Sequence, residues 1–144
     1  MKDAIETHIP TYDDVLAAHE RIKPYIHRTP VLTSHFMNEL TGAELFFKCE
    51  NFQKAGAFKV RGACNAVFGL SDEMAAKGVA THSSGNHALS LSYAAGRRGI
   101  PCNVVMPRTA PEAKKAAVRG YGGTITECEP STTSREAVFA EVHE

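Results

Sequence analysis

Residues 51–65 read NFQKAGAFKVRGACN, a glycine-punctuated turn that runs into a helical pattern. Lys59 lies just inside the expected start of that helix. The positive end of the helix dipole and the cation of Arg61 both disfavour another positive charge there, so they favour the neutral amine. A neutral lysine amine can form a Schiff base. The stretch makes Lys59 a candidate for covalent catalysis, with a solvated pair of charges at a helix start as the alternative.

A second motif, SSGNH at residues 83–87, follows a predicted strand and opens a predicted helix. Ligands of open parallel sheets bind outside the carboxyl ends of the strands, which is where this turn would lie. Hydroxyl and amide side chains, a glycine that allows close approach, and the free amides of a helix N-terminus suit an anion such as a carboxylate. The alternative is an ordinary helix N-cap formed by Ser83 or Ser84.

The rest of the pattern predicts an α/β fold with an open parallel sheet and crossover helices. Strands expected at 79–82, 102–106 and 124–128 alternate with helices that begin near Asn86 and Pro111. Such alternation is typical of parallel sheets. Elsewhere we expect helices at 11–24, 33–42 and from residue 133 onward, a strand at 45–49, and a helix after Lys59 that buries Val60, Ala63, Cys64, Ala66 and Val67.

The chain is expected to divide into parts of two domains. Residues 1–69 would form the N-terminal part of a larger α/β domain, 70–77 a polar linker, and 78–144 a small α/β domain. The last helical pattern reaches the final residue without a stop signal, and only three strands are expected in the sheet. We therefore expect the N-terminal part of a longer protein, the alternative being a short chain whose last helix frays.

Composition argues against several classes of protein. Sixteen Lys and Arg balance 16 Asp and Glu, so no nucleic-acid partner is expected. The N-terminus lacks an apolar signal region and no apolar run reaches membrane-spanning length, so we expect a cytoplasmic protein without a membrane partner. The 4 cysteines form no C-x-x-C and the 7 histidines show no ligand spacing, so we expect free thiols and no metal site in this chain.

In their order along the chain, Glu50-Asn51, the lysine motif at 56–63 and SSGNH resemble the serine racemase and serine/threonine dehydratase family, pyridoxal 5'-phosphate (PLP) enzymes of fold type II. The resemblance runs from about Tyr12 to the chain end. The strings FFKCE, THSSGNH, TAP and CEPS are most similar to the serine racemase branch.

This resemblance implies a racemase or ammonia-lyase that acts on small hydroxy amino acids: serine, threonine or 3-hydroxyaspartate. Lys59 would hold PLP covalently, Phe58 would pack near the cofactor ring, and Asn86 would hydrogen-bond the 3-hydroxyl of that ring. The expected contacts of the substrate carboxylate are Ser83, Ser84, Gly85, Asn86 and His87. The full-length protein would be a homodimer.

Ser84 bears on the choice of reaction within the resemblance. Members that racemise use a hydroxyl at this position to return a proton on the opposite face of the cofactor, whereas many threonine dehydratases carry alanine. The serine permits racemisation without requiring it, because dehydratases of the family can also carry SSGNH. Loss of the β-hydroxyl, which gives a keto acid and ammonia, would compete with reprotonation.

Other features of the family are incomplete or absent. Its glycine-rich phosphate loop and its divalent-cation site, for Mg or Mn, would lie after residue 144. Candidate nucleotide contacts of the racemase branch are matched by Ser34, Lys54 and Tyr121, but His35, Ala55 and Leu89 replace other side chains. We therefore expect nucleotide activation to be weak or absent.

Two other classes of function are alternatives to this enzyme family. A nucleotide-binding α/β enzyme is disfavoured because neither G-x-G-x-x-G nor G-x-x-x-x-G-K-[ST] follows an expected strand. A non-catalytic interaction domain built on the dehydratase fold remains open.

Overall fold

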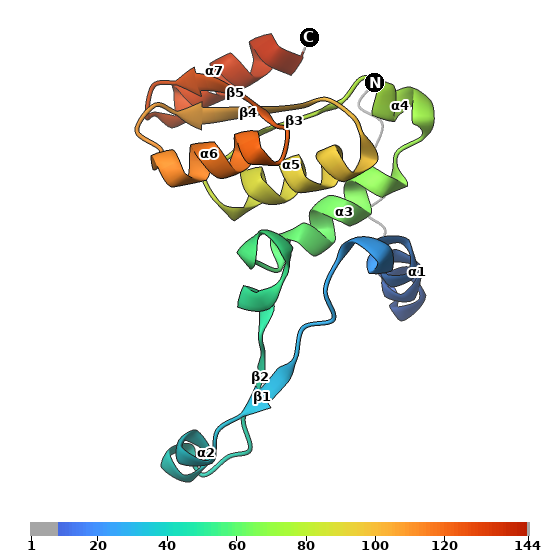
Figure 1. The fold of residues 1–144 in the computed structure, drawn as a ribbon, viewed down its shortest axis with the longest axis vertical. Helices are drawn as coiled ribbons and strands as arrows, with labels where there is room; N and C mark the ends of the chain where they lie inside the picture. Colours follow the sequence, from blue (N-terminus) through green and yellow to red (C-terminus); the bar gives the residue numbers. More distant parts are fainter. Residues whose placement is uncertain (1–8, 144) are drawn as a thin grey trace.

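The computed structural model, which describes residues 9–143, has an α/β fold built on a three-stranded parallel sheet in the order β3-β4-β5 (Figure 1). Its strands are β3 (Val79–His82), β4 (Cys102–Pro107) and β5 (Thr124–Cys128), and the connecting helices are α5 (Asn86–Arg98), α6 (Glu112–Gly120) and α7 (Thr132–His143). Helices α5 and α6 cover one face of the sheet and α7 covers the other (Figure 1). The predicted parallel sheet with crossover helices is confirmed.

Residues 31–48 form a narrow arm that leads away from the sheet, while the helix that precedes them lies beside the sheet domain (Figure 1). After α1 (Tyr12–Ile22) and a 3₁₀ turn η1 (Lys23–Tyr25), β1 (Val31–Thr33) pairs antiparallel with β2 (Phe46–Lys48), and α2 (His35–Thr41) lies at the tip. The hydroxyl of Ser34 accepts the Met37 amide at 3.3 Å, and Gly42 closes α2 with a φ of 67°. Helix α2 and strand β2 were predicted, but β1 was not.

Helix α3 (Lys59–Gly69) joins the arm to the sheet domain by packing against α5. Two 3₁₀ turns, η2 (Glu50–Phe52) and η3 (Lys54–Gly56), precede it. The buried core between the two helices consists of Val60, Ala63, Cys64 and Val67 from α3, and Ala88, Leu91, Ala94 and Ala95 from α5. Each fully buried valine contributes about 1.5–3 kcal/mol relative to exposure. Ala66 is exposed, so its expected burial was wrong.

The segment 70–77, interpreted as a linker, contains the short helix α4 (Asp72–Ala76). Arg98 at the end of α5 donates to the Leu70 carbonyl at 2.9 Å, to the carbonyl of Val67, and to the Asp72 carboxylate at 3.0 Å. These bonds attach the C-terminal end of α5 to that of α3. The division into two domains at this segment stays a prediction, and in the structure helices from both sides of it share one core.

Close packing between α5 and the turn after α6 depends on two glycines. A Cβ atom on Gly96 would overlap the carbonyl oxygen of Tyr121, and one on Gly123 would lie 2.5 Å from the Ser92 hydroxyl. No other residue fits at either position without a shift of its neighbours, because real Cβ contacts are longer. Glycine thus sets how closely the helix layer approaches the strand β5.

The structure places the cysteines and the possible metal ligands among the described residues. All 4 cysteines are free; Cys64, Cys102 and Cys128 are buried and Cys49 is half-buried. Among residues 9–143, no three side chains of His, Cys, Asp or Glu gather as metal ligands would. No helix in that range has the length and apolar character that a membrane crossing needs.

An ion pair between Arg61 and Glu50 fixes the turn that precedes α3. The Arg61 Nε and Nη2 atoms donate to the two oxygens of Glu50, both at 2.8 Å, and the Thr29 hydroxyl donates to the same carboxylate at 2.6 Å. Lys48 Nζ donates to the Thr29 carbonyl at 2.7 Å. Bidentate arginine–carboxylate pairs are the strong form of this bond. The pair therefore joins η2 to the first turn of α3, and the bonds of Thr29 attach the segment before β1 to η2 and β2.

Gln53 adds a second brace beside this ion pair. Its side-chain oxygen accepts the His27 amide at 2.7 Å, while its amide nitrogen donates to the His27 carbonyl at 2.8 Å. Gln53 is only 4% exposed, so both bonds form away from water. Buried polar groups are costly unless they are paired, and here the pairing holds η2 and η3 against the segment before β1.

We predict that the Glu50 ion pair makes stability depend on pH in the acidic range. The Arg61 guanidinium, which outweighs the opposing effect of burial, lowers the pKa of Glu50 from 4.5 to about 2. Its stabilisation is thus complete above pH 4.5 and is lost as the pH falls through about 2. Denaturant midpoints measured from pH 6 down to about 2 should fall less steeply for Glu50→Gln than for wild type.

The matched control is Glu73→Gln, which changes an exposed glutamate in the first turn of α4. Its midpoints should run parallel to those of wild type across the same pH range. Curves for Glu50→Gln and wild type that stay parallel would contradict the assigned role of the ion pair.

Candidate active site

The N-terminal ends of α3 and α5 lie at the same end of the paired helices. Arg98 joins their C-terminal ends. At the opposite end, partial desolvation of the His87 ring, whose residue is otherwise exposed, lowers its pKa, and the nearby charges of Lys59 and His82 lower it further. The turn η3 also contacts α5. Lys59 and the SSGNH turn, which are far apart in the sequence, therefore face one site.

Lys59 is the first residue of α3 and is exposed. Its Nζ atom lies 5.4 Å from the centroid of the Phe58 ring, which is itself 59% exposed. Among the residues that the structure describes, no carboxylate or hydrogen-bond acceptor engages this amine. The cation of Arg61 is paired with Glu50, and its expected effect on the Lys59 amine stays a prediction. The amine is free to react with a carbonyl group.

The SSGNH turn begins where β3 ends and holds the start of α5 open. The Ser83 amide donates to the Val105 carbonyl at 3.1 Å, which extends the pairing of β3 with β4 by one residue. The Gly85 amide donates to the Ser83 hydroxyl at 3.3 Å. Gly85 is the N-cap of α5, and no side chain caps the helix. The alternative of a serine N-cap is therefore not what the structure shows.

The uncapped start of α5 can accept an anion. No atom lies within 4 Å of where a Cβ on Gly85 would be, so the space above the turn is open. The first amides of a helix carry no internal partner and the helix dipole adds a partial positive charge. Asn86 and His87 are exposed on the first turn of the helix. A carboxylate site formed by Ser83, Ser84, Gly85, Asn86 and His87 stays a prediction, and the open start of α5 is compatible with it.

The structure does not bring the three candidate nucleotide contacts together. Ser34 caps α2 at the tip of the arm, far from the sheet and its helices (Figure 1). Lys54 begins η3. Tyr121 follows α6, where its ring meets that of Tyr93 edge-on with 5.6 Å between centroids. A nucleotide site formed by these residues stays a prediction.

Sequence reasoning missed the residues that hold the Lys59 turn in place. Thr29 and Gln53 carry no motif, and their partners Glu50 and His27 lie elsewhere in the chain. A buried polar residue is visible in a sequence only when its partner is known. Glu50 was noted as part of a motif, but its ion pair with Arg61 was not expected.

Comparison with known proteins places these observations in a family. Residues 22–144 match the family described as pyridoxal-phosphate dependent enzyme. The chain is 78% identical over 135 residues to a beta-hydroxyaspartate dehydratase of Paracoccus denitrificans, covering 94% of this chain and 43% of that protein. It is 55% identical over 127 residues to a serine racemase of Dictyostelium discoideum, covering 88% of this chain and 39% of that protein.

A solved structure of a PLP enzyme also matches this chain. The chain matches maize serine racemase with a TM-score of 0.91 and 51% identity, over 94% of this chain and 41% of that one. It spans 39–43% of the curated relatives named above. The expected fold class, the α/β architecture of PLP enzymes of fold type II, is confirmed. On this sequence match and this architecture, the chain belongs to the family of pyridoxal-phosphate dependent enzymes.

Proposed function

We propose that this chain supplies the cofactor lysine and the substrate cradle of a PLP-dependent dehydratase for small β-hydroxy amino acids, with 3-hydroxyaspartate as the first candidate substrate. The observation that carries the proposal is the free amine of Lys59 at the same end of α3 and α5 as the uncapped SSGNH turn. The relative at 78% identity, named beta-hydroxyaspartate dehydratase, supports the choice of substrate.

The described residues fit PLP at its aldehyde and its ring. The aldehyde needs a free amine, which Lys59 offers, and a flat ring needs apolar surface, which the exposed Phe58 offers. Asn86 is exposed at the start of α5 and carries an amide that can donate to the 3-hydroxyl. Lys59, Phe58 and Asn86 would therefore hold the cofactor. Bound PLP supplies an electron sink that weakens the Cα–H bond of a substrate.

The residues of the chain divide the remaining tasks. The open amides at the start of α5 bind the substrate carboxylate and thereby orient the Cα–H bond. Because its pKa is lowered, His87 is neutral at pH 7 and contributes hydrogen bonds without a second charge. Lys59, once freed by substrate, takes the α-proton from its own side. Loss of the β-hydroxyl as water then leads to a keto acid and ammonia.

Serine racemisation is the second candidate, and Ser84 is the observation that favours it. Its hydroxyl lies in the turn at the carboxyl end of β3, where it could return a proton to the side of the substrate opposite Lys59. Relatives named serine racemase at 51–58% identity support this candidate. Serine dehydration and threonine dehydration would follow from the same site.

The proposal also covers the location of the enzyme, its oligomeric state and its metal ion. A cytoplasmic homodimer with a divalent cation, Mg or Mn, is what the resemblance supports. Residues 1–69 would then belong to a larger domain and residues 78–144 to a smaller one.

Lys59 is predicted to be the residue that binds PLP covalently. Borohydride reduction of the PLP-loaded intact protein, followed by peptide mapping, should place the pyridoxyl label on Lys59, because its amine is free. Lys48 serves as the internal control, since its Nζ already donates to the Thr29 carbonyl at 2.7 Å, and Lys54 is a second. A label on either of these lysines would overturn the assignment.

We predict that β-elimination is faster for a substrate that carries a β-carboxylate than for one that does not. Keto acid and ammonia should form from 3-hydroxyaspartate with a kcat/KM at least about tenfold above that for L-serine or L-threonine, a difference of about 1.4 kcal/mol in transition-state stabilisation. Assays of the intact protein with each amino acid test this. A preference for L-serine would move the proposal to the second candidate.

Ser84→Ala is predicted to abolish racemisation and to spare much of the β-elimination. The reason is that Lys59 can abstract the α-proton without help, whereas reprotonation from the other side needs the hydroxyl. D-serine and pyruvate formed from L-serine should be followed in wild type and in Ser84→Ala.

Ser83→Ala is the matched control, because it removes a hydroxyl from the same turn that only supports the cradle. It should lower both products together. If Ser84→Ala also lowers D-serine and pyruvate by the same factor, Ser84 binds substrate without transferring a proton.

A further inference from the structure

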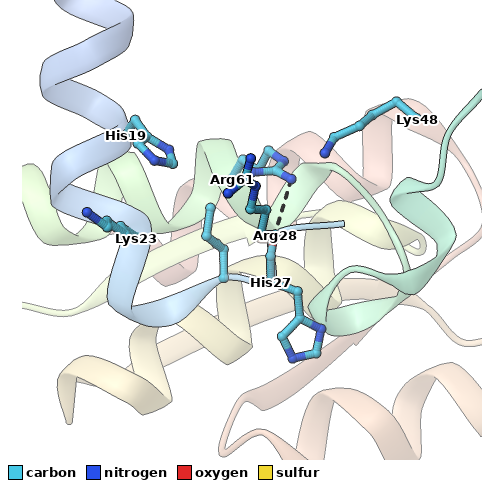
Figure 2. Close-up of a pocket in the computed structure, with 7 residues that line it drawn as sticks. His19, Lys23, His27, Arg28, Lys48 and Arg61 are labelled. Carbon is cyan, nitrogen blue, oxygen red and sulfur yellow. Dashed lines mark hydrogen bonds between the residues drawn. The ribbon is translucent and has the colours of Figure 1, made fainter. Parts of the chain in front are cut away.

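A basic pocket of about 550 Å³ lies beside the first turn of α3, between α1, the segment before β1, and β2 (Figure 2). Six of its lining side chains carry nitrogen: His19, Lys23, His27, Arg28, Lys48 and Arg61. Ile26 is the other lining residue, and no Asp or Glu lines this basic pocket. Figure 2 shows the nitrogen end of Lys48 directed toward Arg28 and Arg61.

The positive charge of the basic pocket is only partly compensated. Glu50 balances Arg61 through two bonds of 2.8 Å. The exposed Glu20 lies 3.6 Å from Lys23, an arrangement that contributes little in water. Within residues 9–143, Arg28 has no carboxylate partner, and Lys48 donates only to the Thr29 carbonyl. Among these residues, Arg28 therefore has no counter-charge in the pocket, and Lys48 is attracted only to Glu50, which is already paired with Arg61.

Like charges held this close repel, and an anion placed between them removes the repulsion. We propose that the basic pocket binds a phosphate-bearing small molecule with at least two negative charges. Arg28 supplies a planar guanidinium that matches two phosphate oxygens at once, and Lys48 adds a point charge. The volume of about 550 Å³ is typical of small-molecule sites and exceeds what a single phosphate fills.

This site is separate from the one that holds Lys59. Lys59 does not line the basic pocket, whereas Arg61, two residues later, does. Residues two apart on a helix point to opposite sides, about 200° around the axis. A ligand in the basic pocket thus contacts Arg61 and leaves the SSGNH turn free.

Calorimetric titration of the intact, PLP-loaded protein with pyrophosphate tests the proposal. Wild type should bind, and its affinity should fall as ionic strength rises. Arg28→Gln removes one charged donor and should raise Kd about tenfold. The matched control is Arg119→Gln, which changes an exposed arginine in the last turn of α6 and should leave Kd within about twofold.

Two results would overturn the proposal. One is that wild type does not bind pyrophosphate at millimolar concentration. Carboxylates from the rest of the intact protein that occupy the pocket would give this result. The other is an equal change of Kd in Arg28→Gln and Arg119→Gln, which would show that general surface charge binds the probe. Lys23→Gln, at a second lining position on an exposed helix face, should weaken binding in the same direction as Arg28→Gln, and no effect would count against the pocket.

Discussion

The parallel packing of α3 against α5 is the constraint on which the rest of the chain depends. Small side chains such as Ala94 and Ala95 let the helices meet around Val60 and Val67, and Arg98 ties their C-terminal ends together. Because both helices run in one direction, their positive dipole ends and Lys59 gather at one end. The positive groups repel one another when no anion is bound there, and a bound anion removes that repulsion. The fold thus prepares an anion site before any side chain contributes.

Much of the sheet domain could be predicted because its signals are local. The strands at 79–82 and 124–128 are bounded as expected, since short apolar runs alternate with helical patterns there. Strand β1 could not be predicted. Its three residues are exposed, so they carry no burial pattern, and its only partner is β2, a contact that depends on register across α2. An isolated two-stranded pair also has little stability of its own, so the local sequence need not favour it.

The residues of the candidate site were predictable from the sequence, but the contacts that hold them in place were not. Lys59 and SSGNH were singled out by residue type and position, and the structure brings them together because α3 and α5 pack over most of their length. Residues alone predicted neither that contact nor the pair of Glu50 with Arg61. The pair was not predicted because Glu50 and Arg61 lie 11 residues apart and meet only through the turn between them. A serine cap for α5 was also a fair local expectation, yet Gly85 occupies the N-cap position and leaves the amides open.

Lys59 and Arg61 are close in the sequence, but the first turn of α3 directs them to different surroundings. The charge of Lys59 acts on His87 at the start of α5, while Arg61 pairs with Glu50 and lines the basic pocket. Were Arg61 unpaired, its charge would act on both sides, because fields in a partly buried turn are weakly screened. Glu50 confines that charge to one side, and its lowered pKa keeps it ionised over the physiological range. The ion pair therefore serves the chemistry proposed at Lys59 through the shape of the turn, because it holds the backbone that leads into the first turn of α3.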